Sequence, residues 1–242
     1  MQLPGLHVVV TGANGSLGAE LCGYLVQRGA VVTGMDIGAS WEQSLPANFS
    51  YMQCDLTDEA EAASVFSSLA KISVLVNLAG RLHSKLVHSP FGKPRRLQGD
   101  EWQSVIDANL RTTYIAGSLA IEQMVDDRSK GLVINIGSIM AYGEVGQSAY
   151  AAAKAGVQSM ALVWAKELGP AGIRAVAIAP GFFDSKSTSD ALSEGKLQEV
   201  KAEIPSRRLG AVREFCECVE MVICNDYING TVLTLDGGVS LR

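Results

Sequence analysis

The fold is decided by Thr11-Gly12-Ala13-Asn14-Gly15-Ser16-Leu17-Gly18, which follows directly on a compact apolar run at residues 6–10. Leu21 and Leu25 continue the spacing of Leu17 until Gly29, so the sequence predicts a strand, a glycine-rich turn and a helix in succession. In this context backbone N–H groups and the positive end of the helix bind a pyrophosphate. Three glycines also occur in turns without a ligand, so the motif needs support from the rest of the chain.

The second apolar run, residues 31–36, closes on Asp36, 18 residues after Gly18. In dinucleotide-binding folds an acid at about this distance binds the hydroxyl groups of the adenosine ribose. A solvated aspartate at a strand end is the alternative interpretation. A carboxylate at the ribose repels a 2′-phosphate, Ile37 is neutral, and residues 11–18 contain no Arg or Lys. The sequence therefore predicts NAD(H) rather than NADP(H).

Strands and helices alternate along the rest of the chain. Further strands are expected at residues 51–54, 72–76, 132–136, 174–178 and 231–235, with helices at about 59–69, 101–124, 150–168 and 216–224. This order predicts a Rossmann-type α/β fold in a single domain over residues 1–242. Its doubly wound, seven-stranded parallel sheet would have helices on both faces.

Ligands bind such sheets at the carboxyl ends of the strands, beside the switch point. The residues that follow expected strand ends are Gly12 to Gly18, Asp36, Asp55, Asn77, Ser138 and Pro180-Gly181. We therefore expect these residues to converge on one edge of the sheet. Two irregular segments are expected nearby: a substrate-side loop at residues 81–99 and a Ser/Thr-rich, mobile stretch at residues 182–189.

Tyr150 and Lys154 lie one helical turn apart, and Ser138 precedes Tyr150 by twelve residues. A neighbouring ammonium favours the phenolate, so we expect Tyr150 to have a pKa below the value of about 10 of a free tyrosine. Such a tyrosine exchanges a proton with a carbonyl or hydroxyl oxygen near neutral pH. A surface tyrosine beside a helical lysine is the commoner meaning of this spacing taken alone.

The composition argues against several classes of function. The 242 residues are 48% hydrophobic and carry a net charge of −5, which fits one well-buried domain and argues against a nucleic-acid surface. No run approaches a membrane-spanning length, and the three histidines lack metal-ligand spacing, so neither a membrane segment nor a metal site is expected. Five cysteines without a CxxC pair, in a sequence without a leader, predict reduced thiols and a cytoplasmic location.

With these motifs the chain resembles the short-chain dehydrogenase/reductase family, in its single-domain branch. The resemblance extends from Thr11 to Gly238 and is carried by TGANGSLG, CDL, NLAG, Asn109, Ser138, YAAAK, IAPG and DGG. The lines GIRAVAIAPG, RRLG and NGTVLTLDGG are most similar to 3-oxoacyl-(acyl-carrier-protein) reductases and to related reductases of polysaccharide biosynthesis. The resemblance implies an oxidoreductase that transfers a hydride between a nicotinamide coenzyme and a carbonyl group or secondary alcohol.

The family implies a role for each matching residue. Tyr150 would be the general acid/base, and Lys154 would lower its pKa and bind the nicotinamide ribose. Ser138 would hydrogen-bond the reacting oxygen, and Asn109 would hold a water that connects Lys154 to solvent. The implied coenzyme-binding residues are Gly12, Asn14, Gly15, Ser16, Leu17, Gly18, Asp36, Ile37, Asp55, Leu56, Asn77, Ala79, Gly80, Tyr150, Lys154, Pro180, Gly181 and Phe183.

Within this set Asp55 and Leu56 would face the adenine, and Pro180-Gly181 would lie near the nicotinamide, with the following segment as a lid. The chain departs from the family pattern at Gly15 and Ser16, which produce the 12/15/18 glycine spacing of the longer, epimerase-like branch. Leu78 replaces an asparagine, and the loop at residues 81–99 is longer than is usual in carrier-protein reductases. Both a small-molecule and an acyl-carrier substrate therefore stay open.

Two other functions fit parts of the sequence. A catalytically silent dinucleotide sensor or scaffold typically lacks the tyrosine or the lysine, and a sugar-modifying epimerase or dehydratase usually has an additional C-terminal domain. Relatives imply a homotetramer or homodimer paired through the helices of Asn109 and Tyr150. The candidates for substrate contacts are the aromatic residues Phe91, Phe182 and Phe183 and the basic residues His83, Lys85, His88, Arg95 and Arg96.

Overall fold

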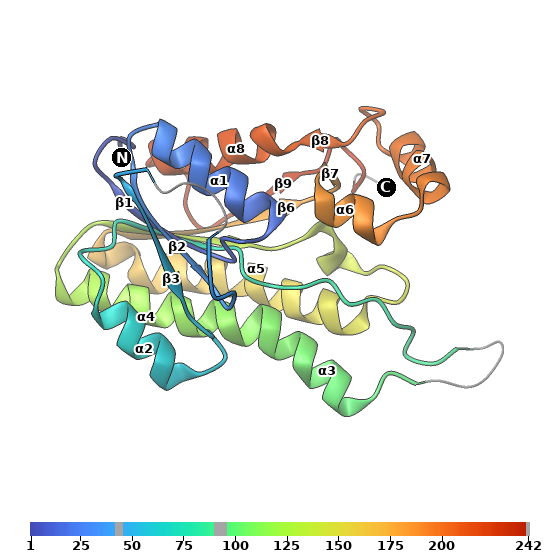
Figure 1. Ribbon diagram of the computed structural model, residues 1–242, viewed down its shortest axis with the longest axis horizontal. Helices are drawn as coiled ribbons and strands as arrows, with labels where there is room; N and C mark the ends of the chain where they lie inside the picture. Colours follow the sequence, from blue (N-terminus) through green and yellow to red (C-terminus); the bar gives the residue numbers. More distant parts are fainter. Residues whose placement is uncertain (42–45, 90–95, 241–242) are drawn as a thin grey trace.

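Seven parallel strands form the central sheet of the computed structural model, which describes residues 1–41, 46–89 and 96–240 (Figure 1). The strands are β1 His7–Thr11, β2 Val31–Asp36, β3 Phe49–Gln53, β4 Val74–Asn77, β5 Gly131–Ile136, β6 Ile173–Pro180 and β9 Val232–Leu235. Their order across the sheet is β3-β2-β1-β4-β5-β6-β9. The predicted seven-stranded, doubly wound parallel sheet is confirmed.

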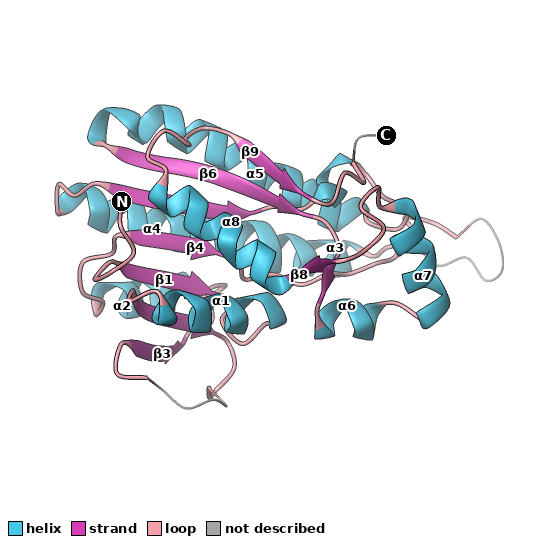
Figure 2. Cartoon of the chain, turned by 90° about the horizontal axis from the view of Figure 1, so that it is seen from above, coloured by secondary structure: helices cyan, strands magenta, loops and turns pink. Residues whose placement is uncertain are grey.

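Helices cover both faces of this sheet. Those that pack directly on it are α1 Ser16–Gln27, α2 Glu59–Ser67, α4 Thr112–Asp126, α5 Ser148–Leu168 and α8 Val212–Cys224. α1 and α8 lie on one face and α2, α4 and α5 on the other (Figures 1 and 2). Leu21 of α1 and Phe215 of α8 belong to one core, whereas Phe66, Ile115 and Trp164 belong to the second. The central strands are buried on both sides, which explains their continuous apolar sequences.

The single helix expected at residues 101–124 is instead interrupted by a π-helical turn. α3 Gly99–Ile106 runs into the π turn Asp107–Arg111, and α4 continues from it. In a regular α-helix the N–H of Asn109 would bond to the carbonyl of Val105. Here the side-chain amide of Asn109 also donates to that carbonyl, at 3.0 Å. Such competition loosens the helix locally, and π turns of this kind are frequent at functional sites.

Residues 182–189, expected as a mobile stretch that leads to a helix, already contain regular elements in the structure. β7 Phe183–Asp184 pairs with β8 Gly210–Ala211 in a small second sheet, and α6 Lys186–Ala191 follows, with α7 Glu194–Glu203 beyond it. Phe183 fixes this segment because its buried ring packs edge-on against Phe215, with 6.0 Å between the ring centres. The hydroxyl of Ser185 caps α6 by accepting a hydrogen bond from the N–H of Thr188.

The order of the strands reverses between β1 and β4, and this switch point positions the site. β2 and β3 lie on one side of β1, and the strands from β4 onward lie on the other. The loops after β1 and β4 therefore diverge and open a crevice at the edge of the sheet. Thr11 joins the two loops at their base, because its hydroxyl accepts hydrogen bonds from the N–H groups of Leu78 and Ala79, both at 3.1 Å.

The five cysteines Cys22, Cys54, Cys216, Cys218 and Cys224 are all free thiols. Across the described part of the chain, no three His, Cys, Asp or Glu side chains are grouped as a metal site would require. Among these same residues, no helix has the length and apolar character that crossing a bilayer takes.

Candidate active site

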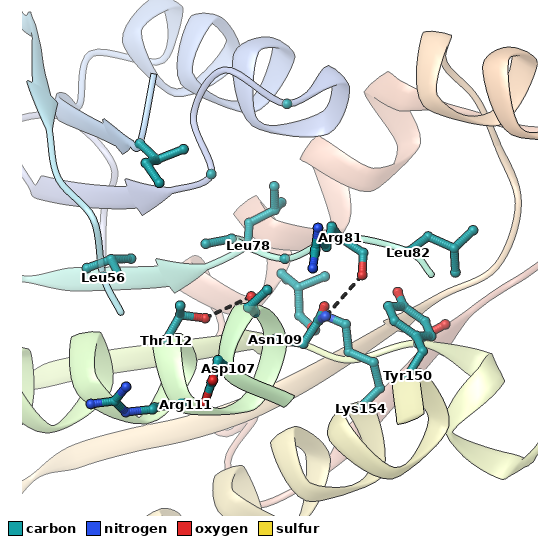
Figure 3. Close-up of a pocket in the computed structure, with 18 of the residues that line it drawn as sticks. Leu56, Leu78, Arg81, Leu82, Asp107, Asn109, Arg111, Thr112, Tyr150 and Lys154 are labelled. Atoms are coloured by element: carbon teal, nitrogen blue, oxygen red, sulfur yellow. Dashed lines mark hydrogen bonds between the residues drawn. The ribbon is translucent and has the colours of Figure 1, made fainter. Parts of the chain in front are cut away.

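A cleft of about 1060 Å³ lies along the carboxyl ends of the strands, at the crevice between β1 and β4. Its walls come from the ends of β1 to β6, from one side of α3 and α4, and from the start of α5. Figure 3 shows Tyr150 and Lys154 reaching up from α5, while Leu56 and Arg111 lie at the opposite end. The residues that follow strand ends thus meet at one edge of the sheet, as the sequence led us to expect.

The turn after β1 combines glycines with the N-terminus of α1. Gly12 has a φ of +70°, and a Cβ there would lie 2.8 Å from the Cα of Ala79. A Cβ at Gly18 would lie 2.2 Å from the carbonyl oxygen of Gly12, so glycine is required at both positions. Gly15 caps α1 without a side-chain hydrogen bond, and the first turn carries no acidic residue. The positive end of the helix dipole therefore suits an anionic group such as a phosphate.

Asp36 lies at the end of β2, half-buried, on the wall of the cleft. Its carboxylate accepts hydrogen bonds from the N–H groups of Asn14, at 3.0 Å, and Gly38, at 3.2 Å. The side chain of Asn14 donates to the hydroxyl of Tyr51 at 2.9 Å. Asn14 therefore orders the loop behind the carboxylate and does not line the cleft. Ile37 lies beside Asp36 on the same wall.

The ends of β3 and β4 form the next part of the wall. Asp55 and Leu56 line the cleft, and the Asp55 carboxylate accepts hydrogen bonds from the N–H and hydroxyl of Thr57, at 2.9 and 2.7 Å. Asn77, by contrast, is buried inside the sheet. Its amide donates to Oδ1 of Asn135 on β5 at 3.0 Å, so it joins two strands and does not line the cleft.

Asn109 is completely buried in the π turn. Its amide nitrogen donates to the carbonyl oxygens of Arg81 and Val105, both at 3.0 Å. Its Oδ1 has no hydrogen-bond partner among the residues that the structure describes. A Cβ at Gly80 would lie 2.4 Å from this oxygen and 3.5 Å from Nζ of Lys154, so both groups lie close to Gly80. An orphaned, buried acceptor near an ammonium suits a bridging water.

Ser138, Tyr150 and Lys154 come together where β5 ends and α5 begins. Ser138 is buried, and its hydroxyl accepts a hydrogen bond from the N–H of Met140 at 3.1 Å, which caps the 3-10 helix Ile139–Tyr142. The Ser138 hydroxyl also acts on Tyr150, because a hydrogen bond from it favours the phenolate. Lys154 is buried, donates from Nζ to the carbonyl oxygen of Ile136 at 2.8 Å, and lies 5.7 Å from the centre of the Tyr150 ring.

The expectation of a lowered pKa for Tyr150 is wrong for this structure. Burial raises the pKa of Tyr150, and the hydrogen bond with Ser138 opposes the increase without cancelling it. Burial also lowers the pKa of Lys154, from its ordinary value of 10.5 to about 8. The two shifts have one physical cause, because the low-polarity surroundings disfavour both the phenolate and the ammonium.

Most of the expected residues line the cleft. They are Gly12, Gly15, Ser16, Leu17, Asp36, Ile37, Asp55, Leu56, Ala79, Gly80, Asn109, Ser138, Tyr150, Lys154, Pro180 and Gly181. Phe183 lies in the core beside Phe215, so its ring does not reach the cleft. Gly18 packs beneath Gly12 instead of lining the cleft.

The structure adds cleft residues that the sequence interpretation missed. Arg81 and Leu82 follow directly on the segment NLAG, and their position after a strand end was the available signal. Gln103, Asp107 and Arg111 recur every four residues on the α3–α4 wall, which is a helical spacing. Ser187 of α6 lines the cleft, and its hydroxyl lies 2.8 Å from that of Ser16.

The candidate substrate contacts are only partly described. Phe91 and Arg95 lie outside the described residues. Lys85 forms an ion pair with Glu101, so its charge is already neutralised. His88 and Arg96 pair across an isolated antiparallel bridge. None of His83, Lys85, His88 and Arg96 is among the described residues that line the cleft.

The cleft fits a dinucleotide. Two glycines whose Cβ atoms would clash shape the turn below it, an acid is held at the end of β2, and the buried Oδ1 of Asn109 lacks a partner among the described residues. The turn at Gly15 to Leu17 would hold the phosphates, and Asp36 would hold a ribose. Tyr150 and Lys154 would face the other half of the molecule (Figure 3).

Comparison with known proteins gives consistent results. The profile of the short chain dehydrogenase family matches residues 6–195. The chain is 31% identical over 257 residues to 3-hydroxyacyl-CoA dehydrogenase type-2 of Homo sapiens, covering 100% of this chain and 97% of the relative. It is 30% identical over 250 residues to 3-oxoacyl-(acyl-carrier-protein) reductase FabG of Escherichia coli, covering 99% of both chains. A solved 4-hydroxyisoleucine dehydrogenase complexed with NADH shares the fold, with a TM-score of 0.89, 22% identity, and coverage of 98% and 99%.

The burial of Lys154 predicts a characteristic pH dependence of stability. Folded Lys154 loses its proton near pH 8, whereas the unfolded lysine keeps it to about 10.5. Between these values the unfolded chain binds more protons, so the free energy of unfolding should rise by about 1.4 kcal/mol per pH unit relative to Lys154→Met. Urea unfolding of both proteins at pH 7 to 10 measures this difference. The control is Lys166→Met, which removes an exposed lysine of the same helix, and its free energy of unfolding should depend on pH as that of the wild type does. If the curves of Lys154→Met and the wild type against pH were parallel, the prediction would be contradicted.

Proposed function

The chain belongs to the short-chain dehydrogenase family and is an oxidoreductase that acts on carbonyl and alcohol groups with a nicotinamide coenzyme; on this premise we propose that Ser138, Tyr150, Lys154 and Asn109 form its catalytic site. One observation carries the proposal. These four side chains reach the same cleft as the glycine-rich turn and Asp36, although they come from the segment after β5, from α5 and from the π turn. The reacting oxygen and the coenzyme would thus be held side by side.

When bound, the coenzyme supplies or accepts the hydride. The side chains of the protein transfer the proton. The hydroxyl of Tyr150 donates a proton to the oxygen of a carbonyl group under reduction, and it takes the proton back in the reverse direction. The hydroxyl of Ser138 donates a hydrogen bond to the same oxygen and fixes its position. Because burial raises the pKa of Tyr150, the phenol is protonated at neutral pH, which is the form that reduction requires.

Lys154 and Asn109 support this proton transfer. With a pKa of about 8, Lys154 is mostly protonated at neutral pH, and its charge stabilises the phenolate that remains after the proton has left. Oδ1 of Asn109, which has no partner among the described residues, would accept a hydrogen bond from a water that also contacts the ammonium. This water gives Lys154 a route for proton exchange with solvent.

We infer that NAD(H) is preferred over NADP(H). The Asp36 carboxylate is held on the cleft wall by two backbone N–H groups, so it cannot turn away without losing both hydrogen bonds. A 2′-phosphate at the ribose would bring a like charge beside it. Ile37, the next residue on this wall, offers no compensating cation.

The substrate side of the cleft favours an apolar substituent. Leu82 lies beside Tyr150 on the cleft wall (Figure 3). Together with the relatives named for hydroxyacyl-CoA and oxoacyl-carrier substrates, this apolar side chain beside the proposed acid supports an acyl thioester or aliphatic ketone. It gives no support to a sugar nucleotide, the substrate of an epimerase or dehydratase.

The exposed face of α4 and α5 supports a symmetric dimer, which a second interface would extend to a tetramer. An open groove of about 520 Å³ runs between α5 and the wall formed by α3, the π turn and the start of α4, and its apolar lining includes Leu110, Tyr114, Met160, Val163 and Trp164. Tyr114 and Val163 are 54% and 46% exposed, so a large apolar side chain from each wall of the groove faces outward. Two copies of one face pair across a twofold axis.

Tyr150→Phe should lower turnover by about 10²–10⁴-fold, the range that a general acid contributes. The measurement is NADH oxidation against a panel of 3-oxoacyl thioesters and aliphatic ketones, with NADH affinity followed by fluorescence. Coenzyme affinity should fall far less than turnover, because the glycine-rich turn and Asp36 are left intact in the same cleft. Tyr227→Phe, at an almost fully exposed tyrosine, is the matched control. Equal rates for wild type and Tyr150→Phe would show that Tyr150 is not the acid and would favour a non-catalytic role.

Asp36→Asn should weaken the preference for NADH over NADPH about tenfold or more, because the variant removes the charge and keeps an oxygen acceptor for one of the two loop N–H groups. The ratio of kcat/KM for NADH to that for NADPH measures the effect. Asp55→Asn removes a second cleft carboxylate that this proposal does not use for selectivity, and it should leave the ratio unchanged. A wild-type enzyme that prefers NADPH would end the proposal.

Val163→Asp should dissociate the proposed assembly, because it would bury a carboxylate in each half of the interface. Sedimentation velocity should show a dimer or tetramer for the wild type and a monomer for the variant. Val145→Asp places the same charge on an exposed valine outside the groove and should leave the sedimentation coefficient as it is. A monomeric wild type would contradict the inference.

A further inference from the structure

One face of α5 holds the end of β5 at more than one point. Tyr150, Lys154 and Gln158 follow each other at four-residue intervals, so they lie on the same face of the helix. Lys154 donates to the carbonyl oxygen of Ile136 at 2.8 Å. One turn later, Gln158 donates from Nε2 to the carbonyl oxygen of Ser138, also at 2.8 Å. Two successive turns of the helix thus bind carbonyl groups two residues apart.

Gln158 is also packed firmly in place. It is only 6% exposed, in a helix where a glutamine at this depth costs desolvation unless its amide is bonded. A Cβ at Gly137 would lie 2.7 Å from both Cγ and Nε2 of Gln158, so the side chain fills the space beside that glycine. From the opposite side, the N–H of Gly137 donates to the carbonyl oxygen of Ile178 on β6 at 2.7 Å. The segment is therefore fixed between α5 and β6.

The hydroxyl of Ser138 depends on this backbone. It accepts a hydrogen bond from the N–H of Met140 at 3.1 Å, and the carbonyl of the same serine accepts one from Ala141 at 3.2 Å. Rotation of the Ser138 carbonyl would therefore change the start of the 3-10 helix and move the hydroxyl. The hydrogen bond from Gln158 to this carbonyl opposes such a rotation.

We propose that Gln158 is a positioning residue of the catalytic site, which sets the place of the Ser138 hydroxyl relative to Tyr150 through its hydrogen bond to the Ser138 carbonyl. The inference rests on the proposed roles of Ser138 and Tyr150 in proton transfer. The amide of Gln158 does not titrate, so its hydrogen bond to the Ser138 carbonyl is available at every pH. The hydrogen bond to the Ile136 carbonyl, by contrast, comes from Lys154, which does titrate. Gln158 reaches the reacting oxygen only through Ser138.

A double-mutant cycle tests this dependence. Gln158→Met keeps the length of the side chain but removes the amide donor. In the wild-type background it should lower kcat about 10- to 100-fold, the effect expected when a reacting group is displaced by a fraction of an ångström to one ångström. In the Ser138→Ala background it should change kcat less than about twofold, because the group it positions is already gone. Equal factors in the two backgrounds would overturn the proposal.

Hydrogen exchange supplies a readout that needs neither substrate nor coenzyme. Amides of residues 137–142 should exchange at least about tenfold faster in Gln158→Met than in the wild type. Gln123→Met is the matched control, because Gln123 also bonds backbone groups, Leu69 and Ile72, but far along the chain from Ser138. It should leave both the exchange of residues 137–142 and kcat unchanged. Unaltered exchange of this segment in Gln158→Met would refute the proposal, whereas absent turnover in the wild type would count against the proposed function alone.

A third variant separates hydrogen bonding from packing. Gln158→Glu has nearly the same shape, and a neutral carboxyl group keeps a donor for the Ser138 carbonyl, whereas a carboxylate has none. Its kcat, divided by that of the wild type at each pH, should approach one at low pH and fall to the ratio of Gln158→Met as the carboxyl ionises. A ratio that does not depend on pH would show that the hydrogen bond plays no part.

Discussion

The site depends on a buried ammonium group whose bonded partner among the described residues is a backbone carbonyl. Lys154 is only 4% exposed and donates to Ile136, the last residue of β5. Burying a charge without a carboxylate partner lowers the stability of a protein, and the lowered pKa of about 8 is the measure of that cost here. The bond also fixes α5 against the sheet. Burial of Lys154 therefore lowers the stability of the fold. Its hydrogen bond nevertheless holds α5, which carries Tyr150, beside the end of β5, which Ser138 follows.

The parallel sheet explains why a few side chains are enough to form the site. Each crossover returns the chain to the same edge, so the turn after β1, the acid at the end of β2 and the serine after β5 meet there. Three of the proposed catalytic side chains, those of Asn109, Tyr150 and Lys154, come from helical elements, the π turn and α5. In both elements a polar side chain donates a hydrogen bond to a backbone carbonyl oxygen. Asn109 donates to that of Val105, and Lys154 donates to that of Ile136. These hydrogen bonds thus hold the side chains in place and at the same time fix the conformation of the backbone.

The sequence was sufficient to predict the sheet and its edge, because apolar runs, glycines and strand-end acids follow from local rules. It was insufficient wherever burial in three dimensions decides the outcome. Asn77 follows the strand pattern as Asp55 does, yet it pairs with Asn135 inside the sheet. Phe183 belongs to a segment that reads as irregular, but its ring anchors that segment in the core. The pKa of Tyr150 shifts opposite to the expected direction because desolvation exceeds the influence of its neighbours.

The departure at Gly15 and Ser16 has an explanation within this fold. The glycine spacing resembles that of a longer branch, but the hydroxyl of Ser16 lies 2.8 Å from that of Ser187 and accepts a hydrogen bond from the N–H of Ser187 at 3.3 Å. Ser187 belongs to α6, which follows β6, so the contact joins the glycine-rich turn to the segment on the other side of the cleft. A glycine at position 16 has no atom that could make it. With serine in place of glycine at position 16, the turn has less backbone freedom but gains a direct hydrogen bond across the cleft. This change requires no change of fold.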